Sequence, residues 1–149
     1  MIQDYEQELT VAGGHNTNFA AGSEYGTKPY DKKGSHDANT GEPIHAFMQI
    51  LGADVDNLTS LKIDIVDSTT GASGGTETVV GSRTFLLADL TQAAGVRRID
   101  ILNPGLAARR YLAAKLTVAG TTPTAGALCK VWLAKATDVA PQNAGVNIG

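Results

Sequence analysis

Apolar and polar residues alternate in short runs through the middle of this chain of 149 residues. In the run SLKIDIVDS, Leu61, Ile63 and Ile65 fall on one side of an extended backbone, and Lys62 and Asp64 fall on the other. A period of two predicts a β-strand with one buried face. Similar β-prone runs predict further strands at 43–51, 77–80, 83–87, 96–103, 109–120 and 127–135.

Glycine- and proline-rich turns separate these runs, as in TTGASGG at 69–75 and TTPTAG at 121–126. Residues 88–95 could hold one helical turn, and no amphipathic helix is predicted. The fold class is therefore all-β. About eight antiparallel strands in two sheets predict a β-sandwich or jelly roll, and the loops longer than hairpins favour Greek-key crossings over a simple meander.

The two ends of the chain differ from the strand-rich block at 42–135. Residues 1–41 contain only three large aliphatic residues, Ile2, Leu9 and Val11, and a short strand is conceivable only at 7–12. Such a segment buries too little apolar surface to offset its ordering entropy. We therefore expect an extended N-terminal arm that orders only against a partner and whose deletion leaves the β domain folded. Residues 136–149 form a short polar tail.

Charge is distributed unevenly along the chain, although its net value is only −3. Residues 1–42 carry seven acidic and three basic side chains, and residues 43–135 carry seven acidic and nine basic ones. A nucleic-acid-binding domain is usually far more basic, so no nucleic acid is expected as a partner. The candidate protein-interface residues are Arg97, Arg98, Arg109 and Arg110. The alternative is that these arginines simply lie on solvent-exposed strand faces.

Three aromatic residues are scattered through the arm: Phe19, Tyr25 and Tyr30. Isolated aromatic side chains can anchor a segment in pockets on a partner. They can equally cover the edge of their own domain, and the sequence does not separate the two interpretations.

No catalytic or metal-binding constellation is evident. The three histidines do not share metal-ligand spacing on one element, and the single cysteine, Cys129, lies in a strand pattern that suits a small buried hydrophobe. The Asp-x-Asp at 54–56 lacks the remainder of a calcium loop and is read as a turn. No enzyme activity, cofactor or metal is expected, and neither a membrane span nor a signal peptide is predicted.

Two stretches of the β domain carry a family resemblance. They are GEPIHAFMQILGADVDNLTSLKIDIVDST at 41–69 and RTFLLADLTQAAGVRRIDILNPGLAARRYLAAKLTVAGTTPTAGALCKVWLAK at 83–135. In the order and spacing of these strands and turns, the chain resembles the Bbp16-type capsid cement (decoration) proteins of tailed bacteriophages. The resemblance covers roughly residues 41–135 and includes no catalytic signature.

The resemblance implies a jelly-roll protein, made in the host cytoplasm, that sits on the outer surface of a phage head. It implies homotrimers that bridge subunits of the major capsid protein and reinforce the shell, without a reaction or cofactor. The alternative is a receptor- or carbohydrate-binding jelly-roll module of a phage particle. That function would require a groove lined by exposed aromatic rings and carboxylates, whereas Trp132, the only tryptophan, is expected in the core or an interface.

Overall fold

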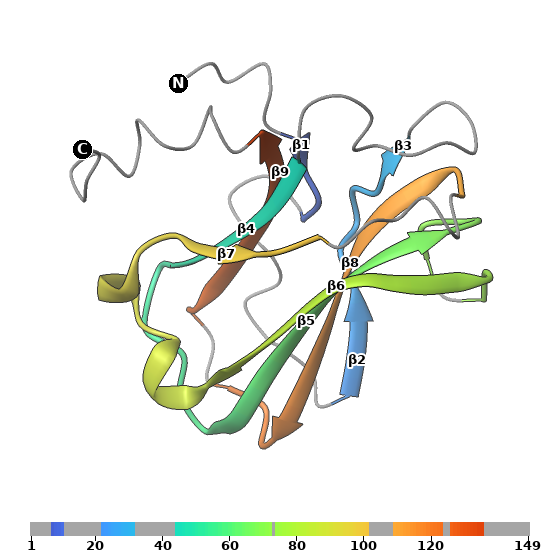
Figure 1. Ribbon diagram of the computed structural model, residues 1–149. Helices are drawn as coiled ribbons and strands as arrows, with labels where there is room; N and C mark the ends of the chain where they lie inside the picture. The colour runs from blue at the N-terminus through green and yellow to red at the C-terminus, as the bar shows by residue number, and fades with distance from the viewer. Residues whose placement is uncertain are drawn as a thin grey trace.

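The computed structural model describes residues 7–10, 22–31, 44–72, 74–101, 109–123 and 126–135. They form two antiparallel sheets packed face to face (Figure 1). The strands are β1 Gln7–Glu8, β2 Gly22–Tyr25, β3 Tyr30–Asp31, β4 Ile44–Leu51, β5 Leu58–Ser68, β6 Glu77–Leu86, β7 Arg97–Ile99, β8 Tyr111–Gly120 and β9 Leu128–Lys135.

The strand order of the two sheets is that of a jelly roll. One sheet has the order β1-β9-β4-β7; the other has the order β2-β8-β5-β6, with β3 also pairing with β8. Because β2 and β3 lie along the same neighbour, they act as one interrupted edge strand, which gives eight strand positions. Apart from the β2–β3 link and the β5–β6 hairpin, all connections cross from one sheet to the other. The prediction of an all-β jelly roll is therefore confirmed.

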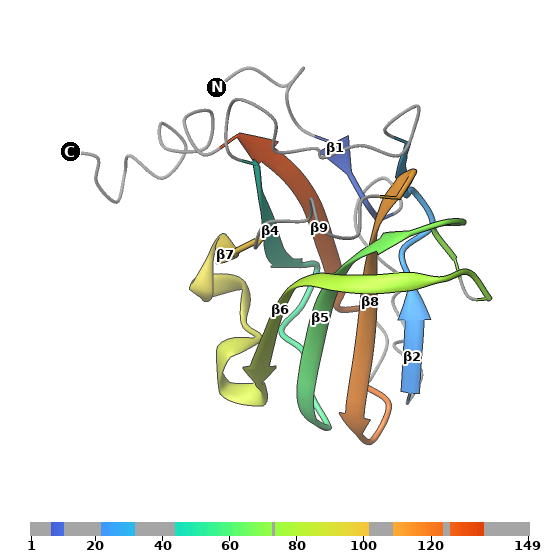
Figure 2. The same ribbon diagram turned by 45° about the vertical axis from the view of Figure 1, so that its right-hand side comes forward.

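The longest strand, β5, lies between β8 and β6, as Figure 2 shows. Leu61, Ile63 and Ile65 are fully buried, as their alternation predicted. Asp64, expected to face solvent, is buried, and a hydrogen bond of 2.6 Å from Ser82 Oγ offsets part of its desolvation. The alternating residues that the pattern places inward at 109–120 and 127–135 are also buried: Leu112, Ala114, Leu116, Val118, Cys129, Val131 and Leu133.

Three predicted elements have different bounds in the structure. The runs at 77–80 and 83–87 form one strand, β6, in which Val80 is an extra residue that shifts the register opposite β5. Such a bulge bends a strand without ending it, so the two predicted runs are continuous. The helical turn expected at 88–95 is two 3-10 turns, at Leu87–Asp89 and Gln92–Ala94. Strand β7 covers only three residues, and residues 102–108 lie outside the described ranges.

Parts of the N-terminal segment belong to both sheets. Strand β1 pairs with β9, and β2 and β3 pair with β8. Leu9 is fully buried in the main core. The prediction that residues 1–41 order only against a partner is therefore wrong for 7–10 and 22–31. These residues obtain backbone hydrogen bonds from the edges of β8 and β9, so their ordering does not depend on many aliphatic side chains.

A second apolar cluster lies apart from the core between the sheets. Phe47 and Trp132 stack with their ring centroids 5.9 Å apart, and Ala134 and Val96 pack with them. Phe47 and Trp132 are directly opposite each other on β4 and β9, whereas their sequence neighbours Met48 and Val131 belong to the main core. Because side chains alternate along a strand, this cluster lies on the outer face of the four-stranded sheet.

Candidate functional site

Tyr25 contributes to the fold of its own domain. Its hydroxyl donates a hydrogen bond to Glu77, and Lys115 Nζ lies 3.0 Å from the same carboxylate and 5.5 Å from the Tyr25 ring centroid. Burial raises the pKa of Tyr25, and the bond to Glu77 adds to this. Burial opposes ionisation of Glu77, but the bonds from Tyr25 and Lys115 outweigh it and leave the Glu77 pKa below its ordinary value. The three residues tie β2 to the β5–β6 hairpin.

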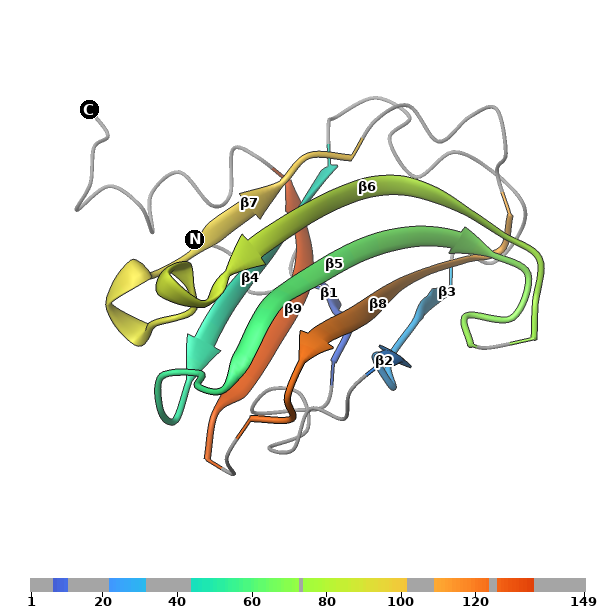
Figure 3. The ribbon, with the colours of Figure 1, turned by 90° about the horizontal axis from the view of Figure 1, so that it is seen from below.

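Tyr30 also packs on its own domain. It lies opposite Leu112 in the β3–β8 pair and contacts the main core. Nearby, the tip of the β5–β6 hairpin, which curls away from the sheet in Figure 3, packs on Pro29, since a Cβ on Gly71 would lie 2.6 Å from the Pro29 ring. For Tyr25 and Tyr30 the structure favours the interpretation that these rings cover their own domain. Phe19 lies outside the described residues.

Arg109 and Arg110 both have partners within the chain. The Arg109 backbone nitrogen donates to Asp67 at 3.0 Å, and its Nη1 donates to Thr78 at 2.7 Å. Arg110 makes two parallel bonds of 2.9 Å to the carboxylate of Asp31. This fork geometry fastens β3 beside the start of β8.

Arg97 and Arg98 lie on β7, beside β6. The guanidinium of Arg97 is 5.5 Å from the ring centroid of Phe85, and that of Arg83 is 4.9 Å from the same ring. Arg83 Nη1 donates to the Arg98 carbonyl at 2.8 Å. Arg98 Nε lies 2.8 Å from Asp100, and both side chains are largely exposed. The arginines of β6 and β7 therefore meet at one margin of the sandwich, whereas Arg109 and Arg110 lie near the start of β8.

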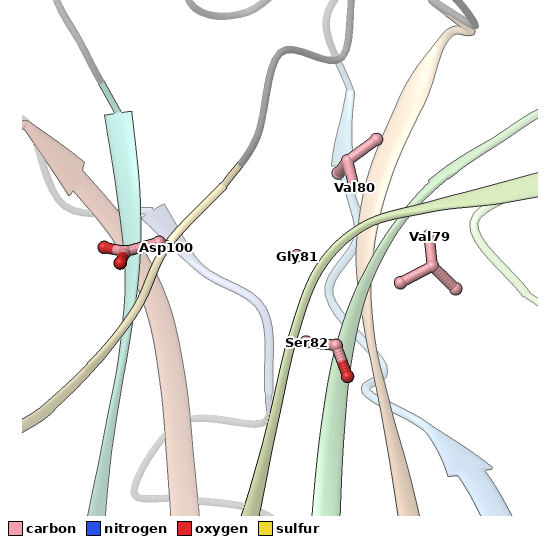
Figure 4. Close-up of a pocket in the computed structure, with 5 residues that line it drawn as sticks. All are labelled: Val79, Val80, Gly81, Ser82 and Asp100. Carbon is pink, nitrogen blue, oxygen red and sulfur yellow. The ribbon is translucent and has the colours of Figure 1, made fainter.

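A pocket of about 280 Å³ opens at the same margin (Figure 4). It is lined by residues 79–82 of β6 and by Asp100, which follows β7. In Figure 4 the Asp100 carboxylate lies away from Gly81, while Val79 and Ser82 project from the β6 side. Val79, at 51 % exposure, and Leu86, at 60 %, are the exposed large hydrophobic residues of the described chain.

The remaining candidates for chemistry have structural surroundings. Asp54 Oδ1 accepts a bond of 2.8 Å from the Gln92 backbone nitrogen, which joins the β4–β5 connection to the second 3-10 turn. Cys129 is buried, and burial raises its pKa to about 12. Within the described ranges, no group of three or more histidine, cysteine or acidic side chains could hold a metal ion. No helix in the same ranges has the length and hydrophobicity needed to span a bilayer.

Trp132 lies in the stacked outer cluster and is only 3 % exposed. Its indole nitrogen is buried without a hydrogen-bond partner in the structure. The ring therefore presents no open face to a ligand, consistent with the expectation of a core or interface position.

No protein-family model matches the chain, and no curated protein matches it in sequence. The site must therefore be defined from geometry alone. The candidate with free surface is the β6/β7 margin, which contains two of the predicted interface residues, Arg97 and Arg98. Sequence reasoning missed Val79 and Leu86, because the extra residue at Val80 disguises their common strand.

Proposed function

We propose that this chain is a structural cement protein on the outer surface of a bacteriophage head, where homotrimers bridge and stabilise subunits of the major capsid protein. The observation that supports this proposal best is the jelly-roll strand order, because the sequence resemblance implies the same fold. Fold by itself does not assign function, so the resemblance at 41–135 remains the second premise.

The packing of the domain is compatible with a reinforcing role. Tyr25, Tyr30 and Arg110, which could have anchored a partner, instead join the N-terminal strands to the rest of the domain, and Arg109 bonds to β5 and β6. A sandwich tied in this way can transmit load between neighbouring subunits with little internal rearrangement. Repetition over a symmetric shell adds avidity, so each contact with the capsid can be weak.

Co-sedimentation with empty phage heads that lack their decoration protein tests the proposal. We expect saturable binding at a fixed ratio to the capsid subunit and higher resistance of the decorated heads to heat. An unrelated jelly-roll domain of similar size and charge serves as the control. Absence of binding above that control at saturating protein concentration would refute the proposed function.

Analytical ultracentrifugation tests the proposed trimer separately. The free protein is expected to sediment as a trimer at high concentration. A stable monomer under those conditions would contradict a preformed trimer, and cryo-EM of decorated heads would then show whether three copies meet only on the shell.

A further inference from the structure

The two margins of the sandwich are closed differently. At the margin formed by β1 and β2/β3, the extended segment 7–10 fills the space between the sheets. Leu9 is fully buried there. Its backbone nitrogen donates to the Val131 carbonyl at 2.8 Å, and its carbonyl accepts a bond of 3.3 Å from the Lys28 backbone nitrogen. An extended segment with one aliphatic side chain is thus the means by which this fold seals a margin.

At the opposite margin the residues after β7 lie against β6, where a Cβ on Gly81 would come within 2.6 Å of the Asp100 carbonyl oxygen and Ile101 packs on the core, but within the described residues they add no strand to the edge of β6. Strand β6 ends the five-stranded sheet and, within the described residues, pairs only with β5. Strand β7 ends the other sheet. An edge strand presents unpaired N–H and C=O groups that can pair with another chain. Both exposed large hydrophobic side chains, Val79 and Leu86, lie on this edge strand.

The pocket beside β6 results from two features of the backbone. Val80 is the extra residue of the bulge, which bends the strand. Gly81 has no side chain, and a Cβ at this position would lie 2.6 Å from the carbonyl oxygen of Asp100, so the chain after β7 lies close against β6 here. When an extended peptide adds to a sheet edge, a pocket next to that edge commonly binds one of the peptide's alternating side chains.

The charges at this margin are incompletely neutralised. Arg83 and Arg97 donate to the backbone carbonyls of Arg98 and Asp89, not to carboxylates, and both guanidinium groups lie over Phe85. Asp100, which lines the pocket, pairs with Arg98 at 2.8 Å and lies 3.5 Å from His45 Nδ1. Among the described contacts Arg83 and Arg97 therefore have no carboxylate partner, and arginine pairs readily with carboxylates.

From these observations we propose that the β6/β7 margin binds an extended acidic segment of a partner protein. The segment pairs with the edge of β6, places one branched aliphatic side chain in the pocket at residues 79–82, and sets carboxylates against Arg83 and Arg97. This proposal does not depend on the identity of the partner or on the proposed function.

The test uses the full-length, 15N-labelled protein and a blocked heptapeptide of alternating glutamate and valine, followed by amide chemical shifts. We expect saturable shifts of β6 and β7 amides, and weaker binding at higher salt because screening reduces the attraction. A peptide in which lysine replaces glutamate is expected to bind at least tenfold more weakly. Equal binding of the two peptides, shifts that map elsewhere, or no saturable shift at millimolar peptide would overturn the proposal.

Val79→Glu places a carboxylate beside the pocket at a largely exposed position and should weaken binding of the acidic peptide at least tenfold. Thr122→Glu, which makes an equal charge change in an exposed turn away from β6, should leave affinity within twofold. Leu86→Glu provides a second variant on the same edge should Val79→Glu fail to fold. If a folded edge variant binds like the wild type, β6 is not the binding edge.

Discussion

Replacement of Leu9 by alanine is the most direct test of the finding that the N-terminal segment belongs to the domain. Leu9 is fully buried among residues of the main core. The truncation removes about three methylene equivalents, or about 2.4 kcal/mol of transfer free energy at ~0.8 kcal/mol each. A residual cavity adds to this, so the expected loss is about 3–5 kcal/mol. A domain of this size has roughly 5–15 kcal/mol in total.

Urea unfolding followed by far-ultraviolet circular dichroism and tryptophan fluorescence measures this loss. With a slope of about 1–3 kcal/mol per molar urea, the unfolding midpoint should fall by at least about 1 M. In thermal unfolding, Tm should fall by roughly 6–20 °C. Leu86→Ala is the matched control, because Leu86 is 60 % exposed and its truncation should cost less than about 0.5 kcal/mol.

Equal costs for Leu9→Ala and Leu86→Ala would show that residues 7–10 do not seal the core, and the N-terminal segment would again be an independent arm. The same reasoning reverses the expectation for deletion of residues 1–41. The deletion removes Leu9 and the strands that cover the edges of β8 and β9, so it should destabilise the β domain severely.

Three further predictions concern single contacts. Because the folded-state pKa of Glu77 lies below its ordinary value, the stabilisation that its carboxylate provides is present at neutral pH and is lost as the pH falls through that pKa. Glu77→Gln should therefore flatten the dependence of stability on acid pH. An unchanged profile of stability against pH would contradict the role of Glu77 in holding β2. Cys129, whose pKa burial raises to about 12, should react with Ellman's reagent at mildly alkaline pH only as fast as the protein opens, whereas rapid reaction of the native protein would show that the thiol is accessible. Gly81→Ala should lower the free energy of unfolding by about 1–3 kcal/mol, because the new Cβ would meet the Asp100 carbonyl. Thr84→Ala, at an exposed position of the same strand, should be nearly neutral. Equal urea midpoints for the two variants would disprove the close approach of Asp100 to β6.

The alternation of apolar residues determined the class of the fold and most of its strands. In β5, β8 and β9 the alternating residues of one face pack in the core between the two sheets, and the period of two records this directly in the sequence. No run of the sequence shows the helical period of about 3.6, so no amphipathic helix was predicted. The sequence also predicted that Cys129 is buried, since it occupies an inward position of the last strand.

The candidate surface was predicted only in part. The sequence drew attention to Arg97 and Arg98, but it could not show that Arg83 and Arg97 share the ring of Phe85 or that Arg110 is committed to Asp31. Partners at such sequence separations are brought together only by the crossings between the sheets. The bulge at Val80 further interrupted the pattern that would have related Val79 to Leu86.

The sequence alone therefore determined that the chain forms a two-sheet β domain, because burial of one strand face is a local property of the pattern. Only the tertiary structure decided the role of the N-terminal segment. Its composition predicts disorder, yet its backbone completes the edges of β8 and β9 and its single leucine closes the core. Edge pairing is non-local and depends on backbone groups that every residue possesses, so composition carries no record of it.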